Sequence, residues 1–363
     1  MKKTIAIVCS DITQLGGIER VVCNFTDSLI KSGNYSAVII SLNSFDGKPI
    51  YELNSNVKLV HIGIKNYGSL IKRIASYFSI VQKISKICEE NNINIIMGTM
   101  ARLNIMLSFV KKAGLIKIAC EHEIYNNATF HTSFVRRIIY PKLNALVVLS
   151  EKDAKNYTFC KYIKVIPNSL TFIPKNTSNL ENKVVMSAGR LQKVKGFDVL
   201  IESISLIKDN CGDWKFRIFG EGSEKEFLMH LIEKKGLENF VEIMPITQNI
   251  EKEYCNSSIY VLSSKKESFG LVLLEAKSCG LPIVSFDCPN GPAEIVRNGI
   301  DGTLVENGNV KALSQAILKL IENPDLRKKY GQEAVKDIGR FSQKHVFEMW
   351  ENLFKELGEK DVN

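Results

Sequence analysis

The chain has 363 residues, of which 45% are apolar and 24% charged, so it is long enough for two hydrophobic cores of ordinary domain size. Lysine and arginine exceed aspartate and glutamate by nine (48 minus 39), and this basic balance favours anionic partners such as a nucleotide diphosphate or a membrane surface. No basic patch is interleaved with aromatic residues and no helix-turn-helix pattern occurs, so we predict no nucleic-acid partner.

The first apolar run, residues 4–9, is followed by a polar turn that contains glycine. It is too short for a secretory signal, and no run in the chain reaches the ~18 apolar residues needed to cross a bilayer. We therefore interpret it as the first buried strand. The nine cysteines form no C-x-x-C pair and no zinc-type pairing with histidine. They are typical of reduced core thiols in a cytosolic protein, and we predict no metal site.

The next segment, residues 11–30, combines the pair Gly16-Gly17 with a helical pattern of apolar residues. A strand, a glycine pair and a helix in that order predict a loop that approaches phosphate, although a tight turn without a ligand has the same pattern. No G-x-G-x-x-G occurs, so a dinucleotide-binding fingerprint is absent. Strands expected at 38–42 and 57–62 alternate with helical patterns, which predicts a parallel, doubly wound α/β sheet.

A long helical pattern follows between Tyr67 and Glu90. Its charges are mainly basic, at Lys72, Arg73, Lys83 and Lys86. An amphipathic basic helix can dock on anionic lipid, but a packed surface helix with solvated lysines has the same pattern. The basic, partly apolar stretch 134–142 can add to an acceptor or membrane face, or it can be a solvated helix end.

Further strands are expected at 93–97, 116–120 and 145–150. His122 stands just beyond the second of them, and the carboxyl ends of strands are where open α/β sheets collect ligands. A lone histidine is also common as a structural residue, so both roles stay open. The polar, proline-containing stretch 171–181 is expected to be a linker between two domains.

The second half opens with a strand at 184–188 and a small-residue turn that presents Arg190 and, five positions on, Lys195. A departing diphosphate develops negative charge, and two fixed cations would stabilise it. Arginine offers a planar fork and lysine a point charge, which suits a diphosphate. A solvated basic loop is the alternative.

Two carboxylates, Glu267 and Glu275, flank a turn and an apolar, helix-favouring run. A helix that begins near Phe269 would leave its first amides without intrahelical partners, and these amides with the helix dipole form an anion site. Glu267 would lie at the mouth of this helix and Glu275 about two turns inside it. Together the two carboxylates could hold hydroxyl groups on either side of a bound diphosphate, as in a nucleotide sugar.

This segment resembles the E-x7-E motif of retaining glycosyltransferases of the GT-B fold, specifically family four of the glycosyltransferase classification. The similarity continues through residues 279–287 and 291–296, and the G-R-x-x-x-x-K-G pattern at 189–196 resembles a second signature of that family. The resemblance implies two Rossmann-like doubly wound α/β domains that face each other across a cleft. The implied parts are an acceptor-binding domain at 1–168, a nucleotide-sugar-binding domain at 169–340, and a C-terminal helix at 341–363 that packs back on the first domain.

The resemblance also implies roles for individual residues. The catalytic set would be His122 and Glu267 near the donor sugar, with Arg190 and Lys195 on the diphosphate. The donor-binding set would be Gly16, Gly17, Gly220, Ile246, Phe269, Gly270, Leu271 and Glu275, with Glu275 on the ribose. No protein nucleophile is implied, and the leaving phosphate itself can act as the base.

The implied function is retaining, metal-independent transfer of a hexose or N-acetylhexosamine from a nucleoside-diphosphate sugar, with UDP as the expected carrier and no other cofactor. The expected acceptor is a lipid-linked saccharide or polysaccharide in bacterial capsule, O-antigen or exopolysaccharide synthesis. We expect a cytoplasmic enzyme bound peripherally to the inner face of the membrane through its anionic surface. The alternatives are an epimerase or hydrolase of nucleotide sugars, for which only Glu121, His122 and Glu123 cluster suitably, and a non-catalytic binding subunit.

Overall fold

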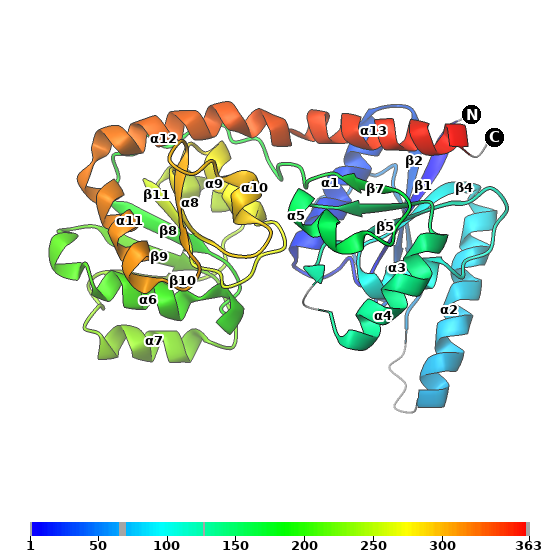
Figure 1. Ribbon diagram of the computed structural model, residues 1–363, viewed down its shortest axis with the longest axis horizontal. Helices are drawn as coiled ribbons and strands as arrows, with labels where there is room; N and C mark the ends of the chain where they lie inside the picture. Colours follow the sequence, from blue (N-terminus) through cyan, green and yellow to red (C-terminus); the bar gives the residue numbers. More distant parts are fainter. Residues whose placement is uncertain (1, 65–69, 126–127, 361–363) are drawn as a thin grey trace. The chain divides into compact units, whose positions relative to one another are not determined.

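The computed structural model describes residues 2–64, 70–125 and 128–360, except for the side chains of residues 70–75 and 360. The chain divides into two compact units, residues 1–169 with 343–363 and residues 170–342. These limits lie one residue beyond the expected boundary at 168 and two beyond that at 340. Each unit is a parallel sheet covered by helices, so the predicted α/β, doubly wound fold class is confirmed (Figure 1).

The first unit contains a seven-stranded sheet in the order β3-β2-β1-β4-β5-β6-β7, and all of its neighbouring strands are parallel. Its strands are β1 Lys3–Cys9, β2 Tyr35–Ser41, β3 Lys58–His61, β4 Ile93–Gly98, β5 Ile116–Cys120, β6 Ala145–Val148 and β7 Ile163–Val165. The sequence predicts six of them. The last, β7, has three residues and too short a pattern to be recognised.

Helices cover both faces of this sheet, and buried apolar residues form a core cluster on each face. They are α1 Gly17–Lys31, α2 Leu70–Glu90, α3 Ala101–Leu107, α4 Phe130–Ile139, α5 Glu151–Ala154 and α13 Gln343–Lys360, with short 3-10 turns η2 Tyr140–Lys142 and η3 Lys155–Tyr157. The basic residues Lys72 and Arg73 predicted for α2 lie outside the described side chains. Lys83 and Lys86 are exposed.

Helix α13 belongs to the first unit although it lies at the other end of the chain (Figure 1). Leu353 and Phe354 are each 1% exposed and belong to the same core cluster as strand β1. The ring of Trp350 lies 5.1 Å from that of Phe25 on α1, and Phe354 lies 5.7 Å from Tyr35 on β2. The helix therefore completes the first hydrophobic core.

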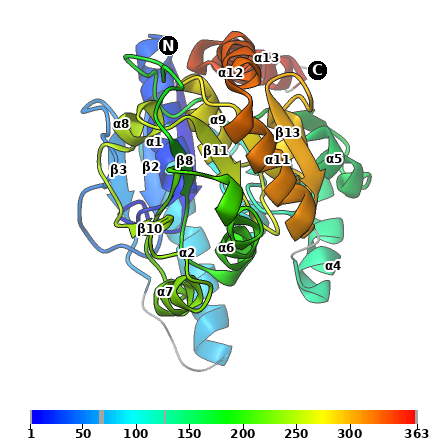
Figure 2. The same cartoon turned by 90° about the vertical axis from the view of Figure 1, so that its left-hand side faces the viewer.

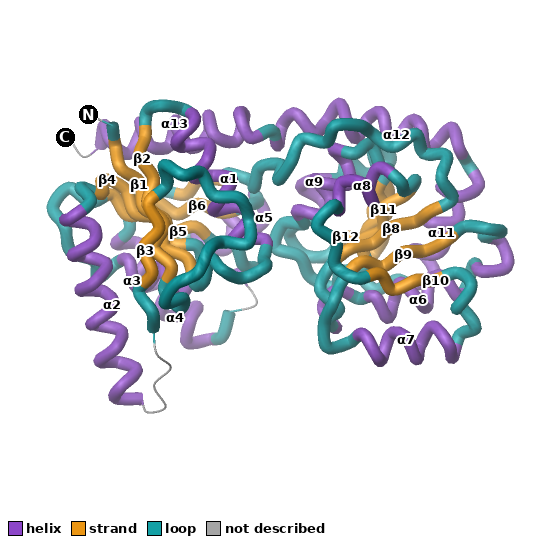
Figure 3. The backbone as a smooth tube through the Cα atoms, turned by 180° about the vertical axis from the view of Figure 1, so that it is seen from behind, coloured by secondary structure: helices purple, strands orange, loops and turns teal. Residues whose placement is uncertain are grey.

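The second unit contains a six-stranded parallel sheet in the order β10-β9-β8-β11-β12-β13, drawn in orange in Figure 3. Its strands are β8 Val184–Ala188, β9 Lys215–Phe219, β10 Val241–Met244, β11 Ile259–Leu262, β12 Ile283–Asp287 and β13 Gly302–Glu306. The sequence predicts strands for β8, β9 and β10, whereas β11 and β12 carry no strand prediction and β13 lies where a turn is expected.

The helices of this unit also lie on both faces, and Figure 2 shows α6 beside α11. They are α6 Phe197–Ser205, α7 Lys225–Lys234, α8 Ile250–Cys255, α9 Leu271–Ser278, α10 Pro292–Ile295, α11 Val310–Glu322 and α12 Pro324–Asp337, with 3-10 turns η4 Lys193–Lys195, η5 Lys208–Asn210 and η6 Ile338–Phe341. Within the described part of the chain, no helix combines the length and the apolar character that a bilayer crossing needs.

Because every strand of a sheet is parallel, all loops that follow the strands emerge at one edge, the carboxyl edge. The strand order reverses between β1 and β4 in the first sheet and between β8 and β11 in the second. Ligands of open α/β sheets bind at such reversals, outside the carboxyl ends of the strands. The fold thus marks one candidate position in each unit.

Candidate active site

In the second unit, the predicted site residues lie in loops at the carboxyl edge of the sheet. Arg190 and Lys195 follow β8, Gly220 follows β9, Ile246 follows β10, and Glu267, Phe269 and Gly270 follow β11 just before α9. The loops after β8 and β11 are the two that flank the reversal of strand order. The residues predicted for phosphate and sugar therefore stand where the fold marks its candidate position.

Lys195 and Glu267 form an ion pair across this position. The Lys195 Nζ lies 2.5 Å from Glu267 Oε1, and the Ser264 hydroxyl donates to the same oxygen at 2.7 Å. Gly196 makes the approach possible: it has φ +65°, and a Cβ there would lie 2.1 Å from the carbonyl oxygen of Ser263. The sequence analysis expects Lys195 on the diphosphate and Glu267 near the donor sugar. The structure shows the two side chains in contact with each other.

Arg190 is exposed, and among the described residues its guanidinium has no hydrogen-bond or ion-pair partner. Its loop is fixed by the backbone, because the Gly189 amide donates to Phe219 at 3.0 Å. Gly220 is required there, since a Cβ would lie 2.0 Å from the Gly189 carbonyl oxygen. The guanidinium thus projects from a rigid loop. Ile246, in contrast, is 54% exposed on the loop after β10.

Helix α9 begins at Leu271, two residues later than predicted, because Gly270 has φ +97° and acts as its N-cap. The amide of Leu273 donates to Gly270 at 2.8 Å, while the amides before it in the first turn have no acceptor within the helix. The partial positive charge of a helix start favours a phosphate group. This helix start directly follows the loop that carries Glu267.

Glu275 lies one turn into α9 rather than two, and its side chain is only 5% exposed. Its carboxylate accepts hydrogen bonds from the Thr171 hydroxyl at 2.7 Å and the Tyr254 hydroxyl at 3.0 Å. Burial raises the pKa of Tyr254 well above its usual value, so this phenol stays protonated and donates. A ribose hydroxyl that binds Glu275 must share the carboxylate with these two groups. The sequence interpretation missed both, since Thr171 was assigned to the linker and Tyr254 lies in a charged helix.

In the first unit, Gly16 and Gly17 stand where β1 passes into α1. Gly16 has extended backbone angles and is the N-cap of α1. A Cβ on Gly16 would lie 2.2 Å from the Glu19 carboxylate. Gly16 and Gly17 therefore leave backbone without side chains at the carboxyl edge of the sheet. This point is where the strand order reverses.

His122 follows β5 and lines a pocket inside the first unit. Thr99, Asn168 and Ser169 supply other polar groups, and the remaining walls are mostly apolar residues of α1, α13 and the strands. Burial lowers the pKa of His122 to about 4, so the imidazole is neutral near pH 7. A neutral imidazole can donate one hydrogen bond and accept another.

Glu121 and Glu123 do not join His122 in an acid and base cluster. Glu121 is buried, and its carboxylate accepts from Arg136 Nη2 at 2.8 Å, from Asn104 Nδ2 at 3.0 Å and from the Tyr140 hydroxyl. Glu123 is exposed. Over residues 2–64, 70–125 and 128–360, no three His, Cys, Asp or Glu side chains are grouped to hold a metal ion.

Residues 169–337, which include the whole candidate position of the second unit, match the family model described as glycosyl transferases group 1. This match covers the second unit, and together with the two doubly wound parallel sheets and the full-length relatives it supports a glycosyltransferase of the GT-B fold.

The relatives extend the similarity to the first unit. A Haemophilus influenzae protein named as a glycosyltransferase is 28% identical, with 97% of this chain and 99% of the relative covered. A Campylobacter jejuni alpha-1,4-N-acetyl-D-galactosaminyltransferase, whose name specifies a PP-undecaprenol acceptor, is 25% identical over 94% of this chain and 96% of its own. The crystal structure of an S. aureus TarM mutant with Fondaparinux, alpha-GlcNAc-glycerol and UDP has a TM-score of 0.80 at 18% identity, and covers 97% of this chain and 99% of that one. At that identity the likeness supports the fold.

Proposed function

We propose that this chain is a retaining glycosyltransferase that moves a hexose or N-acetylhexosamine from UDP to a lipid-linked saccharide or polysaccharide of the bacterial surface. The observation that carries the proposal is the group of cations and amides at one edge of the second sheet: exposed Arg190, the Lys195–Glu267 pair and the start of α9. This group suits a diphosphate next to a sugar. Binding of UDP by a protein of the same fold supports the choice of base.

In the proposed reaction the bond between the anomeric carbon and the phosphate oxygen breaks, and the acceptor hydroxyl oxygen bonds to the same face of that carbon. The hydroxyl proton passes to the leaving phosphate. Arg190, Lys195 and the first amides of α9 stabilise the charge that develops on the diphosphate. Glu267 and His122 bind sugar hydroxyls, and Glu275 binds the ribose. No side chain is assigned as a nucleophile.

The transfer is proposed to need no metal ion, because Arg190 and Lys195 supply two positive charges for the diphosphate. Turnover should therefore be the same in EDTA as in buffer with added Mg²⁺. Complete loss of turnover in EDTA, restored by a divalent cation, would contradict metal independence without contradicting the transfer itself.

The acceptor is proposed to be approached from a membrane surface. Helix α4 exposes an apolar stripe of Phe130, Phe134 and Ile138, which are 82%, 56% and 49% exposed, and basic Arg137 lies next to it. Side chains four residues apart share one face of a helix, so the stripe is continuous. Apolar groups beside a cation suit the interface of an anionic bilayer. The undecaprenol acceptor of the Campylobacter relative supports a lipid carrier.

Liposome sedimentation tests this surface. We expect binding to phosphatidylglycerol vesicles at low salt that weakens at high salt, and weaker binding for Phe134→Ser. Phe227→Ser is the matched control, since Phe227 is equally exposed, at 53%, on α7 of the second unit. Equal partition of wild type and both variants at every salt concentration would contradict the docking surface.

The function itself is tested by product analysis. Purified protein is mixed with UDP- and GDP-sugars, each with undecaprenyl-diphosphate saccharide acceptors or without acceptor, and products are separated and examined by NMR. We expect a new glycosidic bond with the anomeric configuration of the donor, and UDP as the co-product. An epimerised or hydrolysed donor as the sole product would favour the alternative chemistries, and an inverted linkage would contradict retention.

A further inference from the structure

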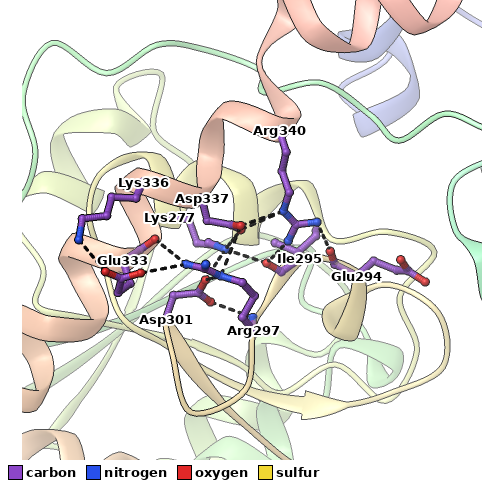
Figure 4. A network of polar contacts seen from close by, with 9 residues as sticks. All are labelled: Lys277, Glu294, Ile295, Arg297, Asp301, Glu333, Lys336, Asp337 and Arg340. Carbon is purple, nitrogen blue, oxygen red and sulfur yellow. Dashed lines mark hydrogen bonds and ion pairs between the residues drawn. The ribbon is translucent and has the colours of Figure 1, made fainter.

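Helix α9 carries, beyond Glu275, a lysine that the proposed chemistry does not use. The side chain of Lys277 is 0% exposed, and its Nζ donates to the Ile295 carbonyl at 2.7 Å. It also donates to Asp301 Oδ2 at 3.0 Å and Asp337 Oδ2 at 2.7 Å (Figure 4). An ammonium has three protons, and these three contacts account for them. The helix is thereby tied to α10, to the turn before β13 and to α12.

Arg340, in the 3-10 turn η6, binds the same partners from the other side. Its Nη1 donates to the Glu294 carbonyl at 2.7 Å and its Nη2 to the Ile295 carbonyl at 2.9 Å, while Nε donates to both oxygens of Asp337 at 3.1 and 3.0 Å (Figure 4). Lys277 and Arg340 thus share Ile295 and Asp337. The last residues of α10 are held by two cations, where a helix C-terminus favours positive charge.

The other end of α10 contacts the turn that carries the candidate site. The backbones of Asn290 and Glu267 pair in an isolated bridge. The backbone of Gly291 lies so close to the turn that a Cβ there would be 2.2 Å from the Phe269 carbonyl oxygen. A displacement of α10 toward the turn would therefore press on the backbone of Phe269, and the bridge couples the backbones of Asn290 and Glu267.

A second contact reaches the same turn through an aromatic pair. The ring of Phe341 meets the ring of Phe269 edge to face, with centroids 5.9 Å apart and planes at 77°. The Arg340 guanidinium lies 4.1 Å from the centroid of the Phe341 ring. Arg340 thus contacts two groups that pack against the 267–270 turn: the end of α10 and the ring of Phe341.

We propose that Arg340 is a positioning residue of the donor site, with Lys277 as its buried partner. It holds α10 and Phe341 against the 267–270 turn, and so fixes the direction of the Glu267 carboxylate and of the first amides of α9 toward a nucleoside diphosphate. The planar fork of arginine spans two consecutive carbonyl oxygens, which a lysine cannot do. This inference rests on the proposed function.

The test compares Arg340→Gln and Arg340→Lys with the control Lys336→Gln. Lys336 pairs with Glu333 at 2.7 Å at the edge of the same network, and its side chain is 70% exposed. The probes are UDP, GDP and ADP in calorimetric titration, together with hydrogen exchange of the amides of residues 267–272. We expect Arg340→Gln to weaken binding of the preferred nucleotide about tenfold and to speed exchange in this turn, since small displacements of a bound geometry are costly. Arg340→Lys should recover part of the loss, and Lys336→Gln should stay within about twofold of wild type.

Two results would overturn the inference in distinguishable ways. If Arg340→Gln binds the nucleotide as tightly as wild type and its turn exchanges at the wild-type rate, the positioning role is wrong and the proposed function stands. If wild type binds none of the three nucleotides, the proposed function fails and the positioning role fails with it. Should Arg340→Gln not fold, the same comparison is made with Arg340→Lys, which keeps the charge beside Asp337.

Discussion

Arg190 and Lys195 lie five residues apart on one loop, yet their surroundings differ. Lys195 is paired with Glu267 at 2.5 Å, while the guanidinium of Arg190 is exposed and has no partner in the described part of the chain. A ligand anion must compete with Glu267 for Lys195, but it meets Arg190 directly. For the proposed diphosphate, Arg190 is therefore the more accessible of the two cations.

Substitution of Arg190 by alanine should lower kcat/KM about 10²- to 10³-fold, because it removes a fixed donor that stabilises developing charge, at a cost of about 3 kcal/mol. The measurement is steady-state transfer from the preferred UDP-sugar. Lys193→Ala is the control, since Lys193 is an exposed cation of the same loop. Equal activity of the Arg190→Ala variant and wild type would show that the diphosphate does not bind at this loop.

His122 should titrate well below the usual range. Burial lowers its folded pKa to about 4 from 6.5, so between these pH values the unfolded chain binds a proton that the folded chain does not. Stability therefore falls as the pH falls from 6.5 toward 4, with a contribution of at most about 1.4 kcal/mol per pH unit. His122→Asn should reduce this loss. An NMR titration of the His122 ring checks the premise, and a midpoint at 6 or above would contradict it.

At the scale of elements, helix α4 is attached to the sheet by a buried charge. Arg136 is 1% exposed, pairs with Glu121 at the end of β5, and stacks on the rings of Tyr125 and Tyr157 at 5.6 and 6.0 Å. The next residue, Arg137, faces solvent. Two adjacent arginines thus have opposite roles, because a helix turns by about 100° per residue and presents them to opposite surroundings.

Arg136→Met should destabilise the first unit by about 3–5 kcal/mol, since it leaves the Glu121 carboxylate buried without its cation. Arg137→Met should change stability by less than about 0.5 kcal/mol, as exposed substitutions do. Urea unfolding of both variants, followed by circular dichroism, measures the difference. Similar midpoints for the two variants would mean that the ion pair adds nothing over its neutral replacement.

At the scale of the whole molecule, the first unit depends on the last segment of the chain. Val346, Leu353, Phe354 and Leu357 of α13 are buried in the core that β1 and α1 begin. The chain thus returns to its first unit after completing the second. The first unit is therefore built from two separate stretches of the chain, whereas the second is a single continuous stretch.

Removal of residues 343–363 should unfold the first unit and leave the second folded. Four fully buried side chains contribute roughly 6–12 kcal/mol, which is comparable with the total stability of a domain. In differential scanning calorimetry, the truncated chain should show only the unfolding transition of the second unit. Its unfolding enthalpy should be smaller than that of the full chain, in which both units unfold. A chain that ends at Lys360 is the control. A truncated protein with the full unfolding enthalpy would contradict this dependence.

The sequence by itself determined the α/β class, nine of the thirteen strands, and the edge of the sheet at which Arg190 and Lys195 stand. The physical reason is that alternating strands and helices force parallel pairing, so that any loop after a strand emerges at the carboxyl edge. The predicted start of α9 differs from the observed one by two residues, because Gly270, with its positive φ, caps the helix.

Only the tertiary structure decided which side chains meet. The contacts of Lys195 with Glu267, of Glu275 with Thr171, and of Phe341 with Phe269 join residues that are about seventy to one hundred positions apart. Sequence periodicity describes one element at a time, over a window of a few turns, and carries no signal for such pairs. The same limit hid the burial of Arg136, since this burial depends on what packs against α4.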